Sequence, residues 1–260
     1  MATHSAPKLS VELDGLRLPL PQALNLAAEL GAEAVEIDAR GEISPRELSR
    51  TGLREVRKML ADRRLRVGSV AFRTRHGYAV PEELDRRIGA TKAVMELASQ
   101  LGAPVVVNAI GPIPPDDDAS GRQMLREALG DLARFGSRVG AILAAETGSE
   151  SGEALARLLA ELPEACLAAD LNPGKLLAAG FSPQEAVAAL GERIRHVHAT
   201  DARGGKLVSL GQGDVDFPAL LAALDEHGYE GCFAVACAGA GDPKRELADA
   251  IARFRSCAGY

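Results

Sequence analysis

The sequence predicts an α/β fold, a single (β/α)8 barrel that spans residues 1–260 as one domain. Short apolar runs alternate with amphipathic segments about every 32 residues if eight such units fill the chain. This alternation favours a parallel sheet, and eight units close it into a barrel. No linker or low-complexity tract interrupts the pattern. A chain of 260 residues can bury one large core, and parallel barrels commonly have this size.

Eight apolar runs are the expected strands, and amphipathic segments separate them. In chain order the strands are residues 9–13, 34–38, 66–72, 104–108, 141–148, 165–170, 194–201 and 232–236. The clearest helices between and after them are residues 53–62, 81–101, 122–138, 153–162, 217–227 and 244–254. The segments 44–47 and 182–185 both begin Ser-Pro and end in Glu, which is typical of a capping box with Pro at the first helical position. Each therefore predicts a helix start.

Polar side chains close several of these strands. His196 and His198 stand at i and i+2 in one strand, so both imidazoles point to the same face. Glu146 and Asp170 end the two preceding strands. The carboxyl ends of barrel strands converge on one face, where active sites of this fold lie. The alternative is that the histidines are ordinary core residues and that Glu146 is either exposed or buried and paired, since an unpaired buried charge is expensive.

The expected ends of the strands and the loops that follow them hold further polar groups. The loop at residues 73–78 is rich in groups that could hydrogen-bond an anion or a polyol, although a solvated loop is an equal alternative. The candidate substrate-binding residues are Glu36, Arg73, His76, Asn108, Asn172, Lys175 and Arg203. The segment Gly211-x-Gly213 is weak evidence for a nucleotide loop, because no strand-to-helix glycine turn with a distal acidic residue surrounds it.

Composition excludes several classes of partner. The net charge is −6 and the sequence contains no Trp and only 3% aromatic residues, which counts against nucleic acid as a partner. No apolar run reaches membrane length and the first ten residues do not resemble a signal peptide, so no membrane partner is expected. Four cysteines without metal-type or disulfide-type spacing suit a reducing cytoplasm. We expect a cytoplasmic protein with a small sugar-like substrate, and a homo-oligomer is compatible with the sequence.

Glu146, Asp170 and His198 are the candidate metal ligands. They come from three successive strands, and two carboxylates with one imidazole suit a divalent ion such as Mn²⁺, Mg²⁺, Co²⁺, Fe²⁺ or Zn²⁺.

The chain resembles the sugar phosphate isomerase/epimerase family, the xylose-isomerase-like TIM barrels. The resemblance covers essentially the whole chain, and its most specific pieces are residues 32–36, 195–201, 210–217 and 228–231. It implies a family metal site with Glu146, Asp170 and His198 as ligands. It also implies a fourth ligand, a Glu near the end of the eighth strand, which in epimerase members is one of two acid/base groups.

The chain departs from the family pattern at two positions. Ala236 stands where the second glutamate is expected, and Pro173 stands where many sugar epimerases carry a substrate-binding His. Without the fourth ligand the site supplies a formal charge of −2 in place of −3, so we expect weak binding of the ion. Cys237 is adjacent, but strand alternation turns it away from the interior.

The sequence supports two functions. The first is a metal-dependent isomerase or epimerase-like enzyme, or a single-base lyase, acting on a small sugar or polyol-derived carbonyl compound with Glu146 as the base. The second is a catalytically silent barrel that binds a sugar-like ligand or a partner protein, because Ala236 occupies the most informative catalytic position. A metal-barrel endonuclease is disfavoured, since it would need a basic face and more metal-ligating histidines.

Overall fold

The computed structural model describes residues 7–41, 43–162, 167–237 and 242–258, and it confirms the predicted barrel. Eight parallel strands close in the order β1-β10-β7-β6-β5-β4-β3-β2. They are β1 (Lys8–Glu12), β2 (Ala34–Asp38), β3 (Arg66–Ala71), β4 (Val105–Asn108), β5 (Ile142–Glu146), β6 (Leu167–Leu171), β7 (Ile194–His198) and β10 (Cys232–Val235). The first residues of the predicted strand 165–170, including Cys166, lie outside the described residues.

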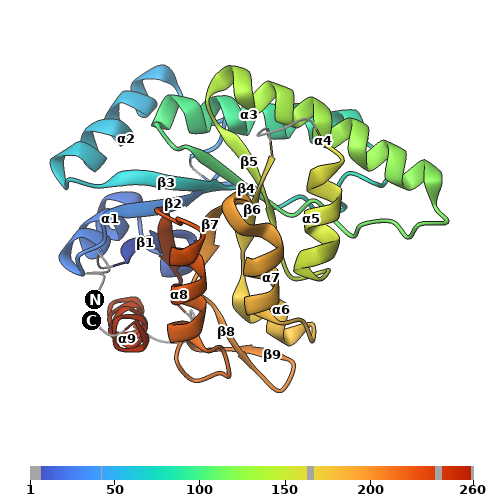
Figure 1. The fold of residues 1–260 in the computed structure, drawn as a ribbon. Coiled ribbons are helices and arrows are strands. Elements are labelled where there is room, and N and C mark those ends of the chain that lie inside the picture. Colours follow the sequence, from blue (N-terminus) through green and yellow to red (C-terminus); the bar gives the residue numbers. More distant parts are fainter. Residues whose placement is uncertain (1–6, 42, 163–166, 238–241, 259–260) are drawn as a thin grey trace.

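Helices surround this barrel, as Figure 1 shows. They are α1 (Leu20–Glu29), α2 (Arg50–Asp62), α3 (Leu84–Leu101), α4 (Ala119–Val139), α5 (Gly152–Ala160), α7 (Pro183–Leu190), α8 (Phe217–Glu226) and α9 (Pro243–Cys257). Within the described part of the chain, no helix is both long and apolar enough to cross a bilayer.

Two features were not expected from the sequence. A short helix, α6 (Pro173–Ala178), follows β6 where the sequence suggested only a turn. After β7, an antiparallel hairpin of β8 (Asp201–Arg203) and β9 (Lys206–Val208) replaces the expected loop and packs against α6. Short 3-10 turns, η1 (Asp14–Leu16) and η2 (Gly191–Arg193), are the remaining elements of the described residues.

One of the two predicted capping boxes is correct. Ser182 caps α7 by accepting the amide of Glu185 at 3.2 Å. The prediction at residues 44–47 is wrong, because Ser44 begins only a turn and α2 starts at Arg50 with Ser49 as its cap. A Ser-Pro-x-Glu sequence supplies local caps but does not supply the following amphipathic turns that a helix needs.

The interior of the barrel has an apolar and a polar half. Strand register places Val105, Val107, Ala144 and Ala168 on the inner face of β4, β5 and β6, where they form a small cluster of their own. The inner positions of β1, β2, β3 and β7 instead carry polar residues, which are Ser10, Glu12, Glu36, Ser69, His196 and His198. The main apolar core lies between the strands and the helices. Several of these polar residues, among them Glu12, Glu36 and His198, therefore lie near the carboxyl ends of their strands.

Candidate active site

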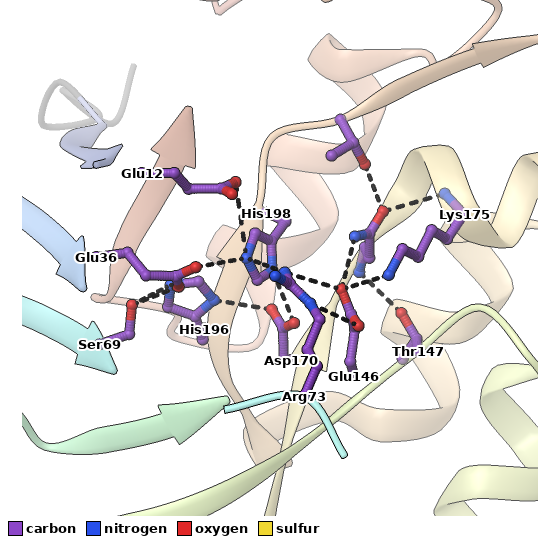
Figure 2. Close-up of polar contacts among 12 residues, drawn as sticks. Glu12, Glu36, Ser69, Arg73, Glu146, Thr147, Asp170, Lys175, His196 and His198 are labelled. Carbon is purple, nitrogen blue, oxygen red and sulfur yellow. Dashed lines mark hydrogen bonds and ion pairs between the residues drawn. The ribbon is translucent and has the colours of Figure 1, made fainter. Parts of the chain in front are cut away.

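Glu146, Asp170 and His198 converge inside the barrel, as the sequence predicted. Glu146 and Asp170 are paired in the register of β5 and β6, and all three side chains are buried. One donor atom from each lies within 4.8 Å of the other two. Figure 2 shows these three residues at the centre of a larger polar cluster.

Glu146 lies among cationic and amide donors. Arg73 donates from Nε to Oε2 at 3.3 Å and from Nη2 to Oε1 at 3.4 Å. Lys175 Nζ is 2.7 Å from Oε1, and Asn172 Nδ2 donates to the same oxygen at 3.2 Å. Because Asn172 also caps α6, the turn after β6 positions both Asn172 and Lys175. Two positive charges therefore compensate the buried Glu146 carboxylate.

Asp170 joins the two histidines of β7. Its Oδ1 is 2.8 Å from Nδ1 of His196 and its Oδ2 is 2.7 Å from Nδ1 of His198. One fully buried carboxylate thus contacts the same nitrogen of both rings and fixes their orientation. The far nitrogens, Nε2, point toward β1, β2 and β3 (Figure 2).

Glu36 and Ser69 contact the Nε2 atoms of the two histidines. His198 Nε2 is 3.2 Å from Glu36 Oε1, and His196 Nε2 is 3.4 Å from Glu36 Oε2. The Ser69 hydroxyl lies 2.7 Å from Glu36 Oε2 and 3.0 Å from His196 Nε2. Glu12 of β1 approaches His198 Nε2 at 3.7 Å.

The charges of the cluster shift its ionisation. Burial by itself raises the pKa of Asp170 and of Glu36, but the two histidines outweigh it and lower the pKa of both carboxyls, that of Glu36 to about 2. Burial opposes protonation of His198, yet Asp170, Glu36 and Glu12 raise its pKa well above the usual value. The pKa of Arg73 is likewise raised by its carboxylate neighbours, against the effect of burial.

Glu12 behaves differently from the other carboxyls. Burial raises its pKa to about 7, and Glu36 adds to the rise, while His198 opposes it. Near neutral pH this carboxyl is therefore divided between its neutral and charged forms.

A cavity of about 510 Å³ opens next to Glu146. Residues 74–77 and 109–112 line it, together with Val80, Glu146 to Ser149 and Lys175. Glu146 is the one carboxylate in this lining, and Arg75, His76 and Lys175 line the same cavity. A small polar molecule placed there would contact Glu146 directly.

The structure brings some predicted substrate-binding residues together and leaves others apart. His76 and Lys175 line the cavity, while Arg73 and Asn172 contact Glu146. Glu36 lies deeper, at the histidines.

Asn108 and Arg203 do not line the cavity. Asn108 pairs with Ala145 in register and therefore faces the helices, where its amide donates to the Phe72 carbonyl. Arg203 lies on the exposed hairpin and pairs with Asp214 at 3.1 Å.

Glu12 and Ser69 are members of the cluster that the sequence reasoning missed. Both stand in runs that were interpreted only as apolar strands. The signal was present in the alternation of residues 9–13, where Leu9, Val11 and Leu13 face outward and leave Ser10 and Glu12 on the inner face.

Comparison with known proteins agrees with this architecture. Residues 24–257 match the family model described as xylose isomerase-like TIM barrel. The chain belongs to this family. No curated protein sequence matches the chain significantly.

Solved structures of the same fold cover nearly the whole chain. A xylose isomerase domain protein from Planctomyces limnophilus has a TM-score of 0.82 and 21% identity, over 98% of this chain and 99% of that one. The 3-keto-D-glucoside 4-epimerase YcjR from E. coli has a TM-score of 0.78 and 17% identity, over 96% and 100%. The probable 3-DHS dehydratase AsbF from Bacillus anthracis has a TM-score of 0.73 and 15% identity, over 94% and 97%. At these identities the similarity establishes the fold.

The residues present fit a divalent ion of the kind the family resemblance implies. Glu146, Asp170 and His198 are of the right donor type and lie close enough to share one ion. Arg73 contacts both Glu146 and His198, so an ion there would replace its guanidinium.

Proposed function

We propose that this chain is a sugar isomerase or epimerase-like enzyme, or a single-base lyase, that acts on a small sugar or polyol-derived carbonyl compound. One observation carries the proposal. Among the described residues, Glu146 is the carboxylate that both belongs to the buried cluster and lines the cavity. Solved sugar epimerases and a dehydratase with the same fold support this class of chemistry.

Glu146 is the base in this proposal. It would take the proton from the carbon next to the substrate carbonyl, and the electron pair of that C–H bond would move onto the carbonyl oxygen. Lys175 contacts Glu146 and lines the cavity, and it supplies N–H donors to the carbonyl oxygen on which the negative charge develops. In isomerisation the proton of the adjacent hydroxyl passes to the former carbonyl oxygen, and Glu146 returns the carbon-bound proton to the neighbouring carbon, so that the C=O bond moves by one carbon. In elimination a β-hydroxyl leaves as water, and Lys175 or His76 is the acid within the cavity that protonates it.

Glu146, Asp170 and His198 would hold the divalent ion. When bound, such an ion polarises a carbonyl and lowers the free energy of an enediolate. Asn172 contacts Glu146 and Asp170 contacts His198, and these contacts would keep the two ligands in place.

Ala236 restricts the reaction to one face of the substrate. Ala234 pairs with His198 in register, and alternation continued past the end of β10 at Val235 would carry Ala236 to the same inner face. A methyl group there can neither bind a metal nor move a proton. A single base is compatible with a suprafacial proton transfer or an elimination, but not with two-base epimerisation.

The test is exchange of the substrate α-hydrogen in D₂O with Mn²⁺ present, across a panel of ketoses and inososes. We expect deuterium incorporation by the parent protein and a loss of at least about a hundredfold in Glu146→Gln, the lower end of the usual contribution of a general base. Glu153→Gln removes an exposed carboxylate of α5 and is the matched control. Exchange that persists in Glu146→Gln would remove Glu146 from this role.

The second candidate is the silent barrel, and a specific contact favours it. Arg73 and Lys175 both lie on Glu146, which leaves its carboxylate neutralised before any ligand binds. If this is the function, no member of the panel will exchange, although sugars will still bind the cavity in calorimetric titration.

A further inference from the structure

The polar half of the barrel contains a second group of metal-type donors, separate from Glu146. Glu36, His196 and His198 offer one donor atom each within 4.8 Å of one another, and all three are buried. Figure 2 shows them on the side of Asp170 that faces Glu12 and Ser69. Such a group is either a buried hydrogen-bonded cluster or a metal site.

The orientation of the two imidazoles favours an ion. Asp170 contacts Nδ1 of both rings at 2.8 and 2.7 Å, so we assign one proton of each ring to Nδ1. A divalent ion between the two Nε2 atoms and Glu36 would take the place of the protons on Nε2, while Asp170 keeps those on Nδ1. A carboxylate that holds Nδ1–H and frees Nε2 for a metal is the usual support of a metal-ligating histidine. Here one carboxylate supports two histidines at once.

The distances have the size of a coordination sphere. Glu36 oxygens lie 3.2 Å from His198 Nε2 and 3.4 Å from His196 Nε2. Zinc-type ions hold such donors at about 2.0–2.2 Å, which separates neighbouring ligands by roughly 3.0–3.5 Å. Glu12 Oε1, at 3.7 Å from His198 Nε2, is a fourth donor within a small shift.

The group also gathers negative charge around His198. Carboxylate oxygens of Asp170, Glu36 and Glu12 lie 2.7, 3.2 and 3.7 Å from its ring nitrogens. Arg73 Nη2 lies 3.3 Å from His198 Nε2 and supplies a positive charge from the open side. Its side chain is about one-third exposed.

We propose that Glu36, His196 and His198, with Glu12 as a further oxygen donor, form a second divalent metal site inside the barrel. Asp170 is its orienting residue. Two imidazole nitrogens select Zn²⁺, Co²⁺ or Fe²⁺ over Mg²⁺. The site shares His198 and Asp170 with the group that would hold the ion of the proposed reaction, but it does not use Glu146.

The experiment is Co²⁺ titration of chelator-treated full-length protein, followed by visible absorption and by metal analysis. Because both groups need His198, which can ligate one ion at a time through Nε2, we expect one Co²⁺ with d–d bands, displaced by Zn²⁺ and not by Mg²⁺. Glu36→Gln and His196→Asn each remove a ligand of this site alone, and we expect at least about tenfold weaker binding. Glu146→Gln removes a ligand of the other group alone, and its affinity should stay within about threefold of the parent.

A second measurement needs no variant and covers the case in which a core substitution fails to fold. X-ray absorption of the Zn²⁺-loaded parent counts bound imidazoles, which are two in the proposed site and one in the Glu146–Asp170–His198 group. One imidazole, or binding that is lost in Glu146→Gln and kept in Glu36→Gln, would overturn the proposal. Failure of the parent to bind Co²⁺ at millimolar concentration would also overturn it.

Discussion

Each carboxyl group of the cluster has a different role because its neighbours differ. Glu146 contacts two cations, Asp170 contacts two imidazoles, and Glu36 contacts both imidazoles and a hydroxyl. Glu12 approaches one histidine at 3.7 Å and has no closer cation among its described contacts. It is therefore the member whose charge is least compensated.

Glu12 should reduce the stability of the metal-free protein as pH rises. Its pKa is 4.5 in the unfolded chain and about 7 in the fold, so the fold favours the neutral form. The contribution of neutral Glu12 to the free energy of unfolding is fully present below pH 4.5 and is lost as pH rises through 7. The shift in pKa corresponds to a loss of roughly 3 kcal/mol at most. We expect Glu12→Gln to gain about 1–3 kcal/mol over the parent between pH 5 and pH 8, measured by urea unfolding in EDTA.

Glu33→Gln is the matched control, because Glu33 is an exposed carboxylate just before β2. An equal pH-dependent gain in this control, or no gain in Glu12→Gln, would show that Glu12 is not the titrating group.

The sequence predicted Glu146, Asp170 and His198 as a convergent group because each closes an apolar run. It could not assign partners across strands. Asp170 contacts both histidines at a point where the register between β6 and β7 is irregular. The sequence of one strand does not specify its register with another strand. Glu12 was missed for the same reason, since β1 meets the histidine strand only through closure of the barrel.

At the scale of elements, the motif residues after β7 stabilise the fold, and none of the described contacts of Asp201 reaches the candidate site. Asp201 is buried and accepts four backbone amides, from Ala202, Gly211, Gly213 and Val215. An added Cβ at Gly213 would lie 2.0 Å from the Asp201 carboxylate. The glycine-rich segment 210–217, which carries part of the family resemblance, thus folds around the Asp201 carboxylate. The β8–β9 hairpin is the part of the chain between Asp201 and this segment.

Asp201→Asn should loosen this segment. The amide that replaces one oxygen faces two backbone donors, so two charge-assisted hydrogen bonds are lost, at a cost of roughly 2–4 kcal/mol. For a chain of this size that corresponds to a fall in Tm of roughly 5–15 °C. Calorimetry measures the fall, and limited proteolysis locates it between residues 209 and 216.

Asp214→Asn is the control for this experiment. Asp214 lies on the same segment but is exposed and pairs only at the surface with Arg203, so its loss should cost about 1 kcal/mol or less. Equal effects of the two substitutions would contradict a central role for Asp201.

The boundaries of the elements were harder to predict than their existence. All eight strands are present, because apolar runs of barrel strands are strong local signals. The hairpin and α6 escaped prediction since both are short, and their stability comes from packing on each other rather than from their own sequences.

At the scale of the whole molecule, closure of the barrel creates the site. Parallel pairing of β1 with β10 and with β2 places the first barrel strand between the eighth and the second, and β10 in turn pairs with the histidine strand β7. Buried polar groups from six strands, β1, β2, β3, β5, β6 and β7, then share one volume. Their ionisation should consequently affect unfolding of the entire barrel and not of one loop.

Acid should therefore destabilise the metal-free barrel through Glu36. Its pKa falls from 4.5 in the unfolded chain to about 2 in the fold, because both histidines and Ser69 favour the charged form more than burial opposes it. The stability from this shift is present above pH 4.5 and is lost as pH falls through 2. By pH 3 about 2 kcal/mol of it should be gone. In urea unfolding with EDTA, the advantage of the parent over Glu36→Gln should shrink by that amount between pH 6 and pH 3, while the difference from Glu55→Gln, an exposed carboxylate of α2, stays constant. A parent advantage that is the same at both pH values would mean that Glu36 stabilises the barrel by packing alone.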